Sequence, residues 1–238
     1  MCGSSNNIAE PCFTLNTAVA KILSEVADVL EAADDVQAAA KKLVKELLTT
    51  HKRVIFNGNN YAEAWVEEAA SRGLPNISNT VLAIKELVTD KHKELFESMG
   101  VLTEKEIDSR YEILLDSYTK TINIEALTLG DIVERQLLPA TLEYALKLSK
   151  IAEKTGSVSA KARLAQLVAL ADNMDAKLSD LKAALVVEAE DAFEIALHYR
   201  EKVFFAMEDL RCTVDATEAV VPAAVWPVPV YCDLLFKV

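Results

Sequence analysis

Histidines and carboxylates are the side chains in this sequence with the greatest capacity for metal or acid–base chemistry. The three histidines, His51, His92 and His198, are far apart in the chain, so a site built on several of them would need long-range convergence. Glu194 and His198 are four residues apart and would share one face of a helix. A di-iron helical bundle needs ExxH motifs on two helices, and the sequence has none. We therefore expect a packing or solvated role for His198 and no metal-binding residue.

Motifs for phosphate binding and for nucleophilic catalysis are also missing from the sequence. The six glycines, at positions 3, 58, 73, 100, 130 and 156, never form GxGxxG or GxxxxGK[ST]. Nothing local to Cys12, Cys212 or Cys232 supplies the histidine and carboxylate that a cysteine nucleophile needs. Together with Cys2, these cysteines lack CxxC spacing, so we expect no disulfide framework. The residues by themselves predict no catalytic and no cofactor-binding side chain.

Acidic residues dominate the charge of the chain. There are 37 Asp and Glu residues against 25 Lys and Arg residues, which gives a net charge of -12. This charge repels phosphate backbones and anionic membranes, so we expect no nucleic acid and no membrane partner. No apolar run approaches the roughly 20 residues that cross a bilayer, and no secretory signal is present, so we expect an intracellular, cytoplasmic protein. Asp131, Glu134 and Arg135 form a charged face that we interpret as solvent-exposed or paired at the surface.

Helices are the elements expected to position these side chains. The sequence is 51% hydrophobic and contains only 6 Gly and 6 Pro, which favours a mostly α protein. From residue 13 onward, apolar residues recur at helical spacing. The first stripe contains Leu15, Val19, Ile22, Val26 and Val29, and a second contains Val36, Ala40, Leu43 and Leu47. The acidic break at residues 34–35 between them predicts two helices joined at an Asp cap.

Turn signals divide residues 54–102 into short segments. They lie at residues 57–60, 72–76 and 99–100. Asn60 and Glu63 have the spacing of a capping box, which predicts a short helix that carries Trp65 and ends at Gly73. Two further short helices are predicted, one over residues 81–88 and one around residues 95–96.

The longest periodic stretch begins after a second capping box, Thr103 with Glu106. Its apolar stripe extends to Leu137, and we interpret the aromatic residues on this and the following segment as core or interface residues: Tyr111, Tyr118 and Tyr144. Pro139 is predicted to kink or end the helix. An unbroken helix over residues 104–154 would be about 75 Å long, which predicts a projecting arm or a long bundle.

Two further helices and a tail complete the predicted fold. Ser157 is a predicted N-cap, and the turn before the returning helix is expected within residues 186–192. Residues 222–238 contain three prolines, which predicts an extended tail that packs Trp226, Tyr231 and Phe236. The predicted fold class is all-α: a long-helix bundle with short helices in residues 54–102 and an extended Pro-containing C-terminal tail.

Four ordered segments resemble the C-terminal third of type III glutamine synthetases. The segments are GSS at 3–5 with IAEP at 8–11 and LNTAVA at 15–20; HKRVIFNGNNY at 51–61 with Trp65 and RGLPN at 72–76; SRYEI at 109–113 with KTINIEALT at 120–128; and AMEDLR at 206–211 with WPVPVYCDLLF at 226–236. Two local departures are the phenylalanines at 204–205, where the family commonly has a proline, and Cys232 in place of a glycine. The four segments follow one another in the family's order and spacing over nearly the whole chain, which makes the set specific.

This resemblance implies nitrogen assimilation by an enzyme that joins glutamate and ammonia at the expense of ATP. It implies divalent metal ions held by carboxylates, and large ring-shaped oligomers. In the family, those carboxylates lie on an upstream β-sheet core, and a strand bearing a Glu and an Arg immediately precedes the Gly-Ser-Ser turn. Here Met1-Cys2 stands where that strand should be. We therefore carry over no catalytic, cofactor-binding or metal residue, and expect ATP and metal only for the full-length family.

The resemblance divides the chain into residues 1–53, a helical remnant that packs on the catalytic core, residues 54–221, a helical domain, and residues 222–238, the tail. Six polar residues carry the resemblance and are expected to cap turns or bridge helices: Asn57, Asn60, Arg110, Glu112, Asn123 and Glu125. The first hypothesis is a partial chain or one piece of a split synthetase, inactive alone, whose partner is a second copy or a complete subunit. The alternatives are a freestanding helical scaffold or oligomerisation module, and an unrelated enzyme with a site assembled from scattered residues.

Overall fold

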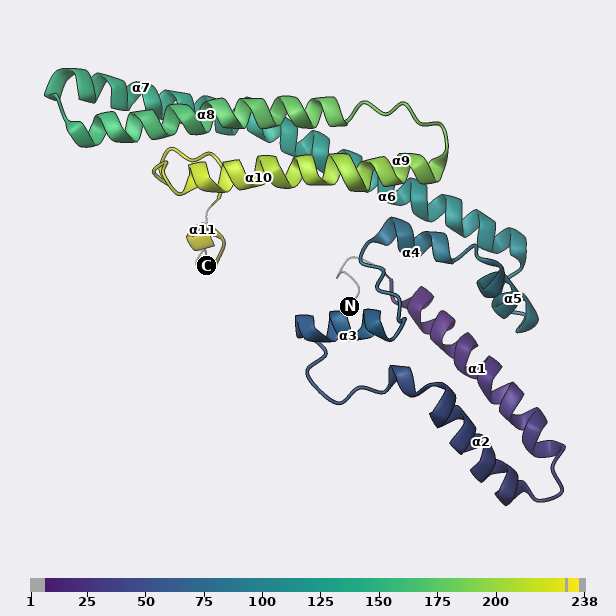
Figure 1. Cartoon of the computed structure of the whole chain (residues 1–238). Coiled ribbons are helices and arrows are strands. Elements are labelled where there is room, and N and C mark those ends of the chain that lie inside the picture. Colours follow the sequence, from purple (N-terminus) through teal and green to yellow (C-terminus); the bar gives the residue numbers. More distant parts are fainter. Residues whose placement is uncertain (1–6, 230, 236–238) are drawn as a thin grey trace. The chain divides into compact units, whose positions relative to one another are not determined.

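The computed structural model describes residues 7–229 and 231–235, and every regular element within them is helical (Figure 1). This confirms the predicted all-α class. The chain divides into two compact units, residues 1–111 and 112–238. The division falls inside one long helix. The domain boundaries expected at 53/54 and 221/222 were drawn from the family resemblance, and they stay a prediction.

A helical hairpin opens the first unit. Helix α1 (Ala9–Glu31) and helix α2 (Val36–Thr50) pack against each other. Asp35 caps α2, because its Oδ1 accepts a hydrogen bond from the backbone N–H of Ala38 at 3.0 Å. The predicted Asp cap between two helices is confirmed.

Short helices follow: η1 (Lys52–Val54), which was not predicted, and α3 (Glu63–Ser71), α4 (Thr80–Glu86) and α5 (Asp90–Ser98), which match the three predicted short helices. The capping box expected at Asn60 and Glu63 is wrong, because the N-cap of α3 is Ala62. The reason is local: Asn59 Oδ1 accepts from Tyr61 N–H at 3.0 Å and closes a turn before the helix begins. The stop at Gly73 is confirmed by its φ of 68°, a left-handed conformation that suits glycine.

The core of the first unit joins α1 and α5 to the start of α6 (Glu104–Ile132). Phe96, Leu102 and Ile107 are buried together, and the ring of Phe13 meets that of Phe96 edge-on with centroids 5.9 Å apart. The predicted capping box at Thr103 is confirmed, since its backbone N–H donates to Glu106 Oε2 at 2.8 Å.

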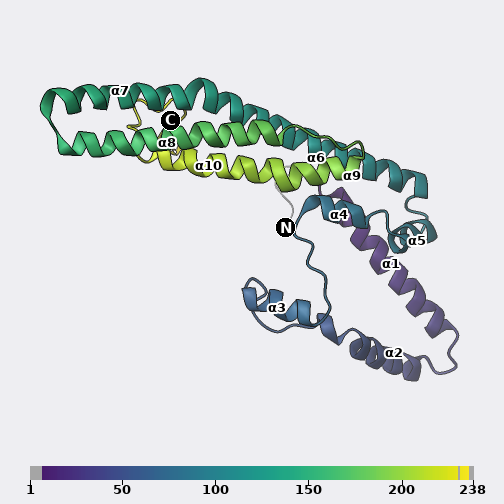
Figure 2. The same cartoon turned by 45° about the horizontal axis from the view of Figure 1, so that its top comes forward.

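Long helices build the second unit: the remainder of α6, the π-helix η2 (Val133–Leu137), α7 (Leu138–Thr155), α8 (Val158–Ala184), α9 (Ala192–His198), the π-helix η3 (Tyr199–Val203), α10 (Phe204–Glu218) and α11 (Tyr231–Leu235). Helix α8 packs along α7 on one side and α10 on the other (Figure 2). Gly156, with φ 67°, ends α7, and Ser157 Oγ caps α8 by accepting from Ala160 N–H at 3.2 Å. The turn expected within residues 186–192 lies there, between α8 and α9.

Pro139 does not end the long helix, contrary to one of the two expected outcomes. The helical chain passes from α6 through η2 into α7, and Leu138 N–H bonds the carbonyl of Val133, five residues back. Proline normally clashes with the carbonyl four residues earlier, which here belongs to Arg135 inside η2. The wider π turn accommodates the ring, so the irregularity precedes the proline.

The core of the second unit is centred on α8. Leu167, Met174, Leu178 and Leu181 of α8 are buried among side chains of α6, α7 and α10, and Tyr118 and Tyr144 pack at its edge, as predicted. Along the described residues, no helix combines the length and the hydropathy needed to cross a bilayer.

The tail differs in part from the extended segment that was predicted. Trp226 is buried in the core, as expected. Val225 and Trp226 donate their backbone N–H groups to the carbonyl of Pro222, and α11 follows, so the described tail folds into a turn and a short helix. Backbone hydrogen bonds within the tail thus replace the hydrogen bonds that an extended segment would need from a neighbouring segment. Phe236 and the side chain of Tyr231 lie outside what the structure describes.

Leu210→Ala should destabilise the second unit by about 2–5 kcal/mol, because this fully buried side chain would leave a cavity. The matched control Leu142→Ala removes the same atoms from an exposed position on α7 and should change the free energy of unfolding by less than about 1 kcal/mol. Urea unfolding followed by circular dichroism measures both. Equal losses would contradict the assigned core.

Glu106 should titrate below the ordinary range of a glutamate. Its pKa is lowered chiefly by the hydrogen bond from the Thr103 backbone and then by the Thr103 hydroxyl. The stabilising cap is therefore present above the unfolded-state pKa of about 4.3 and is lost as pH falls through the lowered folded-state pKa. NMR titration of the carboxyl carbon measures the midpoint, and Thr103→Ala should raise it. A midpoint that the substitution leaves unmoved would contradict the reciprocal cap.

Candidate functional site

Titratable side chains in the described residues form no group of three or more that could hold a metal ion. His198 donates through Nε2 to the carbonyl oxygen of Ala184 at 2.8 Å and so ties α9 to the end of α8. This is the packing role expected for it. The exposed thiols of Cys12 and Cys212 are free.

An arginine clamp organises the loop between η1 and α3. Arg72 Nη1 donates to the backbone carbonyls of Arg53 at 3.1 Å and Ile55 at 2.9 Å, and Arg72 also pairs with Glu68. Its guanidinium lies 5.5 Å from the ring centroid of Trp65. One side chain from the end of α3 therefore holds a segment that lies 17 to 19 residues earlier in the chain.

The same loop contains an aromatic stack. Phe56 stacks on Trp65 with ring centroids 4.0 Å apart. A Cβ at position 58 would lie 2.7 Å from the Phe56 ring, so Gly58 is the residue that fits. Near the stacked rings, the side chain of Tyr61 is 92% exposed, and those of Asn57 and Asn60 are exposed as well. The clamp and the stack thus present a polar loop to the surroundings.

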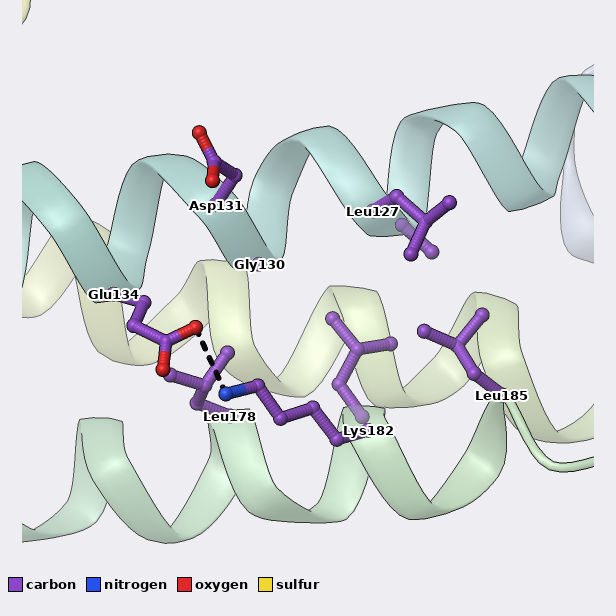
Figure 3. A pocket seen from close by; sticks show the side chains of 9 residues that line it. Leu127, Gly130, Asp131, Glu134, Leu178, Lys182 and Leu185 are labelled. Atoms are coloured by element: carbon purple, nitrogen blue, oxygen red, sulfur yellow. Dashed lines mark ion pairs between the residues drawn. The ribbon is translucent and has the colours of Figure 1, made fainter.

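A groove of about 210 Å³ lies between α6 and α8 in the second unit (Figure 3). Its apolar wall includes Leu127, Leu178 and Leu185, and Gly130 leaves it open because no side chain projects there. Glu134 Oε2 lies 2.8 Å from Lys182 Nζ across the two helices, and this hydrogen bond is the main cause of the lowered pKa of Glu134. The groove is apolar with a charged rim, which suits the side chain of another helix better than a polar substrate.

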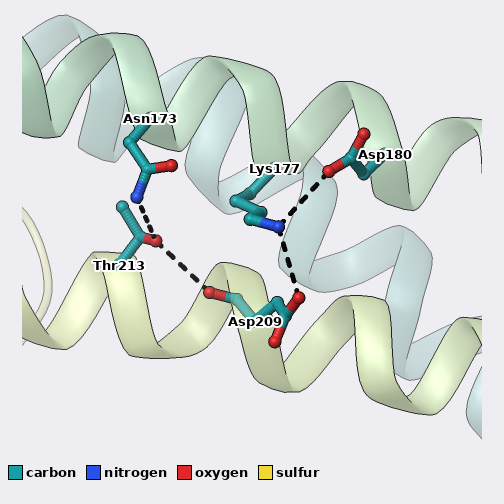
Figure 4. A network of polar contacts seen from close by, with 5 residues as sticks. All are labelled: Asn173, Lys177, Asp180, Asp209 and Thr213. Carbon is teal, nitrogen blue, oxygen red and sulfur yellow. Dashed lines mark hydrogen bonds and ion pairs between the residues drawn. The ribbon is translucent and has the colours of Figure 1, made fainter.

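A polar network joins α8 to α10 on another side of the bundle (Figure 4). Lys177 Nζ lies 3.3 Å from Asp209 and 3.5 Å from Asp180, and the hydrogen bond to Asp209 is the first cause of its raised pKa. Asn173 Nδ2 donates to Thr213 Oγ1 at 3.0 Å. The polar groups of this network bond one another within the protein, so the network aligns the two helices. It leaves none of these described groups open for catalysis.

A second groove, of about 310 Å³, lies between α6, α10 and the tail. Leu129, Val214, Trp226 and Pro229 supply much of its apolar lining, and Arg211 and Asp215, paired at 2.7 Å, lie on α10 beside it. The indole N–H of Trp226 is buried and has no hydrogen-bond partner among the described residues. Within the described part of the chain, neither groove holds a cluster of convergent titratable groups.

Comparison with known proteins decides the family. The family model described as the glutamine synthetase C-terminal domain matches residues 39–156. A glutamine synthetase of Butyrivibrio fibrisolvens is 36% identical over 214 residues, which cover 86% of this chain and 30% of the relative. The type-3 glutamine synthetase of Dictyostelium discoideum is 31% identical over 253 residues, which cover 98% of this chain and 34% of the relative. The chain belongs to the type III glutamine synthetase family.

More specifically, it corresponds to the C-terminal domain of those glutamine synthetases. The chain spans about a third of the length of the curated relatives that it matches, among them a glutamine synthetase of Bacteroides fragilis at 27% identity. The region matched to the family model extends from α2 to the end of α7 and includes the arginine clamp. Residues 3–5, the Met1-Cys2 start and Phe236, which belong to the resembling segments or their flanks, lie outside the described residues.

The six polar residues that carry the resemblance are spread over both units. Arg110 pairs with Glu10 at 3.4 Å and lies 5.6 Å from the ring of Phe13, so it ties α6 to α1. Asn123 Oδ1 accepts from the Tyr199 hydroxyl at 3.1 Å and ties α6 to η3. These two contacts are of the structural kind that was expected.

The remaining four residues, Asn57, Asn60, Glu112 and Glu125, are exposed. Reasoning from the sequence missed the roles of Arg72 and Lys177. Arg72 stands beside the turn signal at Gly73, which indicated where a helix ends but not which carbonyls the side chain would reach.

Arg72→Lys should loosen the clamp while keeping the charge, because the single nitrogen of an ammonium cannot replace a planar guanidinium that bonds both carbonyls through Nη1 and pairs with Glu68 through Nη2. Backbone amides of residues 53–60 should exchange about tenfold faster, as expected for a loss of about 1.4 kcal/mol. Hydrogen exchange followed by mass spectrometry measures this. Arg163→Lys, at an exposed position on α8, should leave the loop unchanged, and an equal effect of both substitutions would count against the clamp.

Proposed function

We propose that these residues form the helical C-terminal part of a glutamate–ammonia ligase and that the ligation requires the part of the protein that the longer relatives have in addition. On this proposal, ATP, divalent metal ions and their carboxylate ligands belong to that other part. The chemistry requires metal ions that neutralise the transferring phosphate and positively charged side chains that stabilise the charge developing on it. The proposed role of the helical part is to fold, to dock on that catalytic part and to support it.

The observation that carries this proposal is the exposed apolar face of the hairpin formed by α1 and α2. Leu15 is 67% exposed, and eight further large apolar side chains of these two helices are exposed with it: Val19, Ile22, Leu23, Val29, Val36, Val44, Leu47 and Leu48. Such side chains contribute about 1.5–3 kcal/mol each when fully buried. A gathering of exposed large apolar side chains on one helical hairpin is typical of an interaction surface.

The stripe predicted from the sequence is therefore only partly used within the unit. Val26 is half-buried, and Thr17 is buried, whereas most of the stripe faces outward. An independent scaffold that buried the face internally would not show this pattern. The pattern supports docking of α1 and α2 on another body, for which the upstream region of the same synthetase is the proposed occupant.

The remaining parts of the proposal follow from family membership. Glutamine synthetases are oligomeric, so we propose that the complete protein assembles with further copies of itself. A cytoplasmic location belongs to the same proposal, since glutamate, ammonia and ATP meet there.

Purified alone, the 238-residue chain should form no glutamine from glutamate, ammonia, ATP and magnesium ions. Coexpressed with the upstream two thirds of the Butyrivibrio fibrisolvens relative, it should restore ATP-dependent glutamine formation. Val19→Asp should abolish that restoration by placing a charge on the docking face, whereas Val168→Asp, at an exposed apolar position on α8, should not. Metal-dependent turnover by the chain alone would overturn the proposal.

A further inference from the structure

One face of α6 has a pattern of side chains that is complementary to itself. The face contains Asp116, Lys120, Ile124, Leu127 and Asp131 of α6, and it ends with Arg135 in the π turn η2, whose 2.7 Å ion pair with Asp131 places it beside them. Successive members are separated by four, four, three, four and four residues, a spacing that keeps them on one side of a helix. The order is acidic, basic, apolar, apolar, acidic, basic, and the spacing is the same in both directions.

When two such faces meet in antiparallel orientation about a two-fold axis, every member faces a complementary one. Ile124 meets Leu127 of the second copy, Lys120 meets Asp131, and Asp116 meets Arg135. An isologous interface requires this self-complementarity, because each contact occurs twice. Opposite charges at matched positions also fix the register and the direction of the pair.

The six side chains are available for such a contact. Ile124 is 64% exposed and Leu127 is 55% exposed. The ion pairs of this face, Lys120 with Asp116 and Arg135 with Asp131, are 2.7 Å long but lie on the surface. Exposed pairs of this kind contribute little to stability, so exchanging them for pairs between copies costs little.

The groove between α6 and α8 adds a recess beside the apolar centre of the face. Gly130 and the leucines at 127, 178 and 185 border this groove of about 210 Å³ next to Leu127 (Figure 3). Figure 3 also shows the Asp131 carboxylate directed away from α8. The recess can receive an aliphatic side chain such as Ile124 of a second copy, which would cover an apolar surface that is otherwise open to water.

We propose that this face of α6 is a dimerisation surface whose occupant is the same face of a second copy of the chain, packed antiparallel. One helix pair buries less than the roughly 1,600 Å² of a standard interface, so the dissociation constant is expected in the micromolar range. The proposal concerns the second unit alone and does not rest on the proposed ligase role. A failed glutamine assay leaves it intact, and a monomeric chain leaves the ligase proposal intact.

Reciprocal charge reversal tests the proposed register in the full chain. Lys120→Asp and Asp131→Lys each place like charges opposite one another, and each should raise the dimer dissociation constant about tenfold. The double variant restores opposite charges between copies and should return to within about threefold of the original value. In the double variant both ion pairs within one chain, Asp116 with residue 120 and residue 131 with Arg135, remain broken, so recovery can come only from contacts between copies.

Sedimentation velocity over a concentration series measures the association, and circular dichroism checks that each variant is folded. Leu127→Glu should abolish dimerisation, while Val168→Glu, on α8, should not. A chain that stays monomeric at all concentrations would overturn the proposal. So would association that is lost in Val19→Asp and unaffected by charge reversal, because the hairpin of α1 and α2 would then be the contact.

Discussion

The burial of α8 is the constraint on which the second unit depends. Leu167, Met174, Leu178 and Leu181 are all buried, and they contact helices on more than one side of α8. A helix with such a broad apolar surface cannot remain in water, so α7 and α10 must lie along it. The contacts of Lys177 and Asn173 with α10 then align the helices once they are close. The exposed side of α6 becomes a surface as a consequence of this packing.

The first unit satisfies the same constraint only in part. Phe96, Leu102 and Ile107 form a small core, and the Arg72 clamp holds the backbone of residues 53–55, which precede α3. Helices α1 and α2 leave an apolar face outside that core. Because exposed apolar surface is unfavourable in water, this face is the basis of the proposal that the unit docks on another protein surface. Membership of the glutamine synthetase C-terminal domain family agrees with that reading.

Much of the fold could be predicted because its signals are local. The caps at Asp35, Thr103 and Ser157 and the stop at Gly156 lie within a few residues of the helices that they bound. The errors arose where local signals competed or were overridden. Asn59, not Asn60, closed the turn before α3, and a π turn accommodated Pro139. The clamp was not predictable, because the partners of Arg72 lie 17 to 19 residues away and are backbone carbonyls, which leave no trace in residue types.

The apolar face of α1 and α2 is central to the account, and direct binding tests it. Isothermal titration calorimetry would measure the binding of this chain to the separately expressed upstream two thirds of a type III glutamine synthetase at several temperatures. The account predicts binding with a negative change in heat capacity, the mark of apolar burial, and its loss in a variant with acidic residues in place of Leu15 and Val19. Absence of binding, or equal binding by that variant, would contradict it.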